Sequence, residues 1–143
     1  MMAPGTGYLG GSFFYGADSP CQRMISETEP RDLVSGDHMP EGMRKAVLSF
    51  LLTGICRVVL GGETSNLMLI HPSLRIADHR AVAEKIRAML ALICSSGPKE
   101  KKDSFLDYSF RDAYCDLQQT LKKPPPFNTA LEVLARAAGS TQV

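Results

Sequence analysis

The stretch "NLMLIHPSLRIADHRAV" at residues 66–82 decides the fold. Residues 67–70 form a run of four apolar residues that is too short for a helix and is bounded by turn-forming residues. A short, continuous apolar run is typical of a strand that is buried on both faces. Helical spacing begins after Asp78. The stretch therefore predicts a strand, a short loop and an amphipathic helix, which together make half of a βαβ unit.

Four amphipathic helices are predicted around this strand. The first follows Pro40, which suits a first helical turn, and it ends before Gly61. The second begins at Asp78, whose side chain can cap it, and the other two cover about 104–121 and 129–139. The predicted apolar stripe of the second helix consists of Val82, Ile86, Met89, Leu90 and Ile93.

The predicted strand has no clear neighbour in the sequence, and a lone strand leaves its main-chain groups without partners. Two interpretations remain open. Either a short strand at 12–15 pairs with it, or the rest of its sheet lies outside this chain. The predicted class is therefore α/β and mainly helical, with one or a few buried strands, as a fragment of a larger fold. Its expected parts are an extended lead-in over 1–39, a helix–strand–helix core over 40–96 and a C-terminal helical segment over 97–143.

The composition is that of a soluble globular domain, with 44% hydrophobic and 22% charged residues among 143. Sixteen Lys and Arg against fifteen Asp and Glu leave a net charge of +1, so the overall charge does not demand a nucleic-acid partner. A local basic patch can still bind one. The longest apolar stretch is interrupted by Arg57 and is too short to span a membrane. The expected location is the cytoplasm, or the nucleus in a eukaryote, with no membrane partner.

The four cysteines are scattered and include no closely spaced pair, so no metal site is expected. Cys56 and Cys94 lie within apolar helical patterns. This placement predicts buried free thiols in a reducing compartment.

His71 is the first candidate functional residue, because the carboxyl end of a strand is where open α/β sheets bind ligands. Three roles remain open for it: a structural hydrogen bond, contact with a phosphate or nucleic acid, and catalysis. Ser73 and the amides of the following helix are candidate phosphate contacts, and so are Arg75 and Arg80. An ordinary charged helix start explains these arginines equally well. A wider basic patch would add His79, Lys99, Lys101 and Lys102.

Three blocks of the sequence, in order, resemble the Z-one (Z1) domain, a family labelled as an endonuclease domain. The resemblance extends to about residue 95. Its first block contains Tyr8, Gly10, Gly11, Phe13 and Phe14. Its second contains Pro40, Ala46, Phe50, Leu51 and Leu52. Its third contains Met68, Leu69, Ile70, His71 and Ser73. The motif positions expected to be structural are Tyr8, Gly10, Gly11, Phe50 and Met68.

The resemblance implies part of a larger ATPase related to superfamily-two helicases and associated with DNA restriction. The strand, loop and helix would then belong to the second lobe of a helicase-like P-loop fold. The sequence departs from that pattern, because it has no G-x-x-x-x-G-K-[ST] motif, no acidic metal-binding strand motif and no downstream arginine motif. ATP and a divalent metal are therefore expected only in a full-length parent, and this chain is expected to hold no cofactor itself.

Two functions are compatible with these observations. The first is a partial Z1-type DNA-processing module, attached to an ATPase lobe that is missing here and non-catalytic on its own, with DNA as a partner. Its acidic residues form no nuclease pattern, so whether it belongs to an enzyme stays open and no catalytic residue is assigned. The second is a helical protein-interaction domain with no nucleic-acid function.

Overall fold

The computed structural model describes residues 16, 18–19, 22–61, 66–95, 105–121 and 123–143. Within them it contains the helices α2 (Glu29–Ser35), α3 (Glu41–Val59), α4 (Ile76–Ser95), α5 (Phe105–Thr120) and α6 (Phe127–Ser140). None of the described residues forms a strand. The expectation of a mainly helical protein is confirmed. The expected short strand at 12–15 lies outside the described residues.

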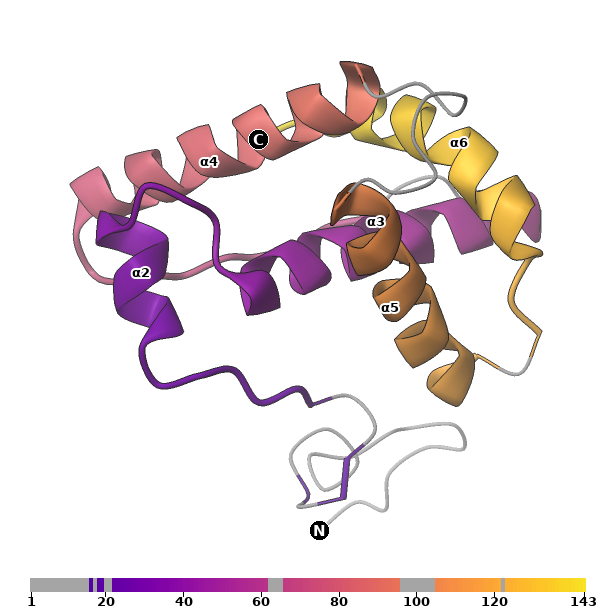
Figure 1. Ribbon diagram of the computed structural model, residues 1–143, viewed down its shortest axis with the longest axis horizontal. Coiled ribbons are helices and arrows are strands. Elements are labelled where there is room, and N and C mark those ends of the chain that lie inside the picture. Colours follow the sequence, from indigo (N-terminus) through magenta and orange to yellow (C-terminus); the bar gives the residue numbers. More distant parts are fainter. Residues whose placement is uncertain (1–15, 17, 20–21, 62–65, 96–104, 122) are drawn as a thin grey trace, which may run out of the picture.

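Helix α3 is the centre of the fold. It packs against α5 and α6, while α4 packs against α6 and α2. Figure 1 shows α3 crossing the middle of the molecule, with α4 above it and α5 passing in front. Because α3 has neighbours on more than one side, Leu48 and Leu52, which lie off its main stripe, are fully buried together with Val47, Leu51 and Ile55. Gly61 ends this segment with a φ of 78°, a left-handed conformation that glycine adopts readily.

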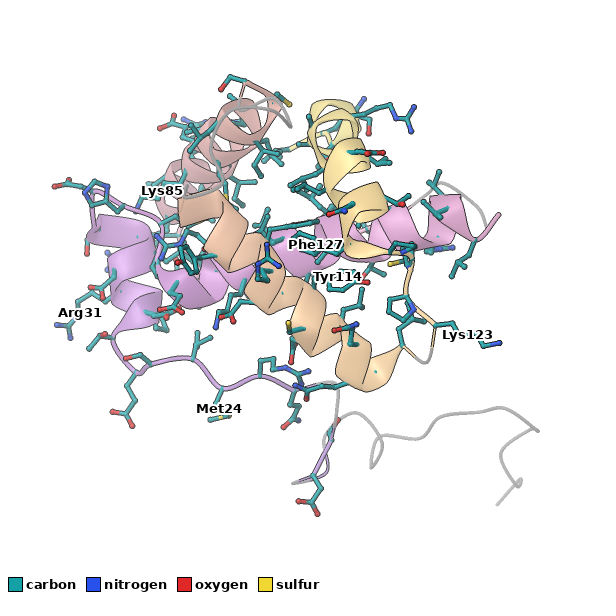
Figure 2. All side chains as sticks on the ribbon, turned by 45° about the vertical axis from the view of Figure 1, so that its right-hand side comes forward. Met24, Arg31, Lys85, Tyr114, Lys123 and Phe127 are labelled. Carbon is teal, nitrogen blue, oxygen red and sulfur yellow. The ribbon has the colours of Figure 1, made fainter. Side chains whose placement is uncertain are left out.

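Aromatic side chains fill the contact between α5 and α6. The Phe127 ring lies 5.6 Å from the Phe110 ring and 5.3 Å from the Tyr114 ring, the latter in an edge-to-face arrangement. The buried Tyr114 hydroxyl donates a hydrogen bond of 2.6 Å to the carbonyl of Pro125. Figure 2 shows Tyr114 and Phe127 next to each other where the two helices meet. Burial of these rings fixes the loop between α5 and α6.

Two side chains from neighbouring helices hold the short helix α2 in place. The Glu29 carboxylate accepts hydrogen bonds from the main-chain N–H of Gly42, at 3.1 and 3.0 Å, in the first turn of α3. The Lys85 ammonium of α4 donates to the carbonyls of Leu33 and Asp32 at the end of α2, at 2.6 and 3.3 Å. These contacts use groups that helix ends leave without partners.

The predicted buried strand at 67–70 is wrong. The segment is not helical and lies over α3, where the Asn66 side-chain amide donates to the carbonyl of Phe50 at 3.0 Å. Only one of its faces is covered: Met68 and Ile70 are half-buried, whereas Leu67 and Leu69 are 93% and 90% exposed. A strand buried on both faces needs neighbouring strands and a second layer. The described residues supply neither, so the α/β class and the helicase-like P-loop lobe are not supported.

Two smaller predictions also change. Helix α4 begins at Ile76, so Asp78 lies inside its first turn and is not the residue before it. Cys56 is buried, as predicted, and burial raises the pKa of its thiol. Cys94 was expected to be buried and is exposed, because it lies beside the buried stripe in the last turns of α4. Its thiol is 3.5 Å from the carbonyl of Ala135.

Candidate functional site at the start of helix α4

The start of α4 is organised around Ser73. Its hydroxyl donates to the Asp78 carboxylate at 2.5 Å and accepts a hydrogen bond from the main-chain N–H of Arg75 at 2.9 Å. The side chain therefore links the loop to the first turn of the helix, in the way that serine caps a helix N-terminus. The sequence after Pro72 folds locally because Ser73 can make both bonds.

His79 strengthens the same turn from the next position of α4. Its Nε2 atom lies 2.7 Å from the Ser73 carbonyl. A carbonyl oxygen can only accept a hydrogen bond, so the ring nitrogen donates and carries the proton. The His71 ring lies against His79, with 5.3 Å between the ring centroids and an angle of 44° between the planes. His71 itself is exposed.

Arg75 and Arg80 are exposed on either side of this turn. Within the part of the chain that the structure describes, neither guanidinium forms a hydrogen bond or an ion pair. They are therefore available to a ligand, whereas the Ser73 hydroxyl is already engaged on both sides. The three lysines of the wider predicted patch, Lys99, Lys101 and Lys102, lie outside the described residues.

The motif positions expected to be structural fall in different places. Phe50 is half-buried and packs against the core of α3. Met68 is half-buried under the extended segment. Tyr8, Gly10 and Gly11 lie outside the described residues.

The sequence did not predict an apolar groove beneath the extended segment. It has a volume of about 1210 Å³ and lies between α3, α4, α6 and residues 66–70. Most of its lining is apolar, with Phe50, Met68 and Val82 among the contributors, and Arg136 and His79 add polar groups. The signal in the sequence was the apolar alternation of residues 67–70, which we interpreted as a strand inside a sheet.

The acidic residues that a nuclease would need are not brought together. No group of three or more His, Cys, Asp or Glu side chains converges within the described residues. Asp112 pairs with Lys45 at 2.8 Å, and Asp116 pairs with Arg23 at 2.7 Å, so these two carboxylates join neighbouring segments. None of the described helices has the length and hydropathy of a membrane span.

Comparison with known families places the chain. A sequence model of the Z1 domain matches residues 42–143, which is more than half of the protein. The chain belongs to the Z1 domain family. The match starts after the Tyr8–Phe14 block and continues beyond residue 95, so it includes α5 and α6. No curated protein and no solved structure matches the chain significantly.

Proposed function

We propose that the chain is a DNA-processing module of Z1 type that contacts nucleic-acid phosphates and does not itself carry out catalysis. Family membership supports the general class. The observation that carries the proposal is the pair of exposed arginines, Arg75 and Arg80, at a turn held rigid by Ser73 and His79. Guanidinium groups bind phosphates well, and a fixed turn reduces the entropy lost when they do so.

Within this proposal the four candidate residues have different roles. Arg75 and Arg80 supply the charge, and the exposed His71 ring can add a hydrogen bond to a phosphate oxygen. Ser73 shapes the turn, since its hydroxyl already donates to Asp78 and accepts from the Arg75 N–H. The negative charge of Asp78 works against phosphate binding close to the helix axis. We therefore place the contact on the arginine side chains at the edge of the turn.

The proposal assigns catalysis and cofactors to other parts of a larger protein. A helicase-like ATPase lobe would bind ATP and a divalent metal, and this module would hold DNA beside it. Such a protein would work in the cytoplasm, or in the nucleus of a eukaryote. The sequence has no phosphate-binding P-loop motif, which supports placing ATP elsewhere.

A second function is favoured by a different observation. Leu67 and Leu69 are almost fully exposed beside an apolar groove, which is the kind of surface that protein partners cover. A helical protein-interaction domain with no nucleic-acid role would present such a face.

DNA binding at two salt concentrations separates these functions. Fluorescence anisotropy with a labelled duplex should detect binding that weakens steeply from about 50 to 200 mM salt. The double variant Arg75→Ala/Arg80→Ala should bind more weakly, and its salt dependence should fall by about two phosphate contacts' worth of slope.

The control is Arg31→Ala/Lys123→Ala, which removes the same charge from two exposed positions on opposite sides of the molecule in Figure 2. It should bind like wild type. Equal weakening in both double variants would mean that only net charge matters and would contradict the assigned site. Failure of wild type to bind at low salt would favour the interaction domain.

A further inference from the structure

The extended segment 66–70 has main-chain groups that could pair with another strand. Within the described residues, no main-chain N–H or carbonyl from 66 to 70 hydrogen-bonds to another main-chain group. The segment is held instead through the Asn66 side chain on the Phe50 carbonyl. A methyl group added to Gly54 would lie 3.6 Å from that amide, so the segment lies close over α3. This leaves the long edges of the segment open.

The side chains of the same segment form an unprotected apolar face. Leu67 and Leu69 point away from the helices and are 93% and 90% exposed. No charged residue or proline occurs between 66 and 70. Exposed edge strands in monomeric proteins are usually protected by charges, prolines or bulges. The absence of such protection indicates a face that is covered in the working protein.

The sequence of the segment is suited to pairing with itself. Leu67, Met68 and Leu69 read the same in both directions. In an antiparallel pair with a two-fold axis at Met68, each Leu67 lies opposite the other copy's Leu69, and the two Met68 residues face each other. All four leucines then lie together on one face of the two-stranded ribbon, at cross-strand distances that allow contact. With no charge in the segment and a net charge of +1 on the chain, little repulsion opposes this contact.

The size of the contact sets its strength. A standard interface buries about 800 Å² per partner. Two leucines and five residues of backbone supply only part of that area, so the association should be weak and concentration-dependent.

We propose that two copies of this chain associate through antiparallel pairing of residues 66–70 around Met68. The interface is isologous, because the same surface is used by both copies. It adds strand pairing to an otherwise helical protein, as in recognition modes that extend a sheet at an open edge. The proposal is independent of DNA binding through Arg75 and Arg80.

Sedimentation velocity across a range of concentrations tests the association. Wild type should shift from monomer to dimer in the micromolar range. The variant Leu67→Lys/Leu69→Lys should remain monomeric at the highest concentration, because like charges would face each other across the ribbon. The control Met24→Lys/Leu92→Lys adds the same charge at two other exposed apolar positions and should dimerise like wild type. Circular dichroism should show the same helical content in all three proteins.

A cross-linking experiment tests the register separately. With the axis at Met68, the variant Met68→Cys places two thiols directly opposite each other, within reach of a disulfide. Mild oxidation should give a covalent dimer on a non-reducing gel. Wild type, with its exposed Cys94 and Cys115, should give none under the same conditions.

Each contrary outcome would overturn the proposal. Wild type could stay monomeric at every concentration. The Leu67→Lys/Leu69→Lys variant could still dimerise. A covalent dimer could form no faster with Met68→Cys than in wild type. Monomeric wild type that binds a separate apolar peptide through residues 66–70 would assign the face to a different occupant.

Discussion

Two pairs of leucines in this protein have the same chemistry and opposite surroundings. Leu48 and Leu52 on α3 are fully buried, whereas Leu67 and Leu69 on the extended segment are 93% and 90% exposed. The first pair lies between α3 and its helical neighbours. The second pair faces outward because only one side of the segment has a layer against it. An apolar side chain stabilises a fold only where a second layer removes it from water.

The largest expected effect tests this contrast directly. Leu52→Ala should lower the free energy of unfolding by about 2–5 kcal/mol, because it removes buried surface and leaves a cavity. The matched change Leu67→Ala should alter it by no more than about 0.5 kcal/mol at low protein concentration. Urea denaturation followed by circular dichroism measures both. A large loss in Leu67→Ala would mean that the segment packs against the core on both faces and that the two regions are alike.

An intermediate effect is expected at the turn that joins the two regions. Ser73→Ala should cost about 0.5–2 kcal/mol, because the Arg75 N–H loses its acceptor and the Asp78 carboxylate loses a donor. Ser95→Ala on the same helix is the control, since that exposed hydroxyl bonds only to the Leu92 carbonyl of its own helix. Thermal unfolding distinguishes the two variants. Equal stability would show that α4 does not need Ser73 to start, which would leave its hydroxyl available for a ligand.

The smallest effect is expected on the exposed side of the α3–α5 contact. The hydrogen bond from Lys45 to Asp112 raises the pKa of Lys45, with a further contribution from Glu41. A raised lysine pKa stabilises the fold below the unfolded pKa of about 10.4, and the contribution disappears as the pH rises through the folded value. Asp112→Asn should therefore cost about 0.5 kcal/mol or less at pH 7, since both side chains are largely exposed.

The difference between Asp112→Asn and wild type should shrink above about pH 10.4, where Lys45 loses its charge. Denaturant titrations at pH 7 and at high pH check this, with Glu132→Gln as an exposed control on α6. A difference that stays constant across this range would assign the effect of Asp112 to packing.

The buried face of α4 illustrates what was predictable. All five residues of its predicted stripe are buried: Val82, Ile86, Met89, Leu90 and Ile93. The spacing of apolar residues along a helix is a local property, so it can be read from the sequence. The exposed Cys94 shows the limit, because the end of the stripe depends on how far α6 extends along α4.

The candidate site was predictable in its residues but not in its connections. The sequence located the chemistry at residues 71–80, yet the bond from His79 to the Ser73 carbonyl and the groove beneath residues 66–70 depend on neighbouring elements. The strand prediction was wrong for the same reason. An apolar run specifies that a segment seeks burial, and it does not specify which elements are present to bury it.

The sequence by itself determined the helices, their apolar faces and the family, because each of these depends on short-range spacing and residue order. Only the tertiary structure decided that Glu29 caps α3, that Lys85 closes α2, and that Leu67 and Leu69 remain on the surface. These outcomes depend on residues distant in the chain meeting in space. The free energy of such contacts comes from the neighbours that the fold provides.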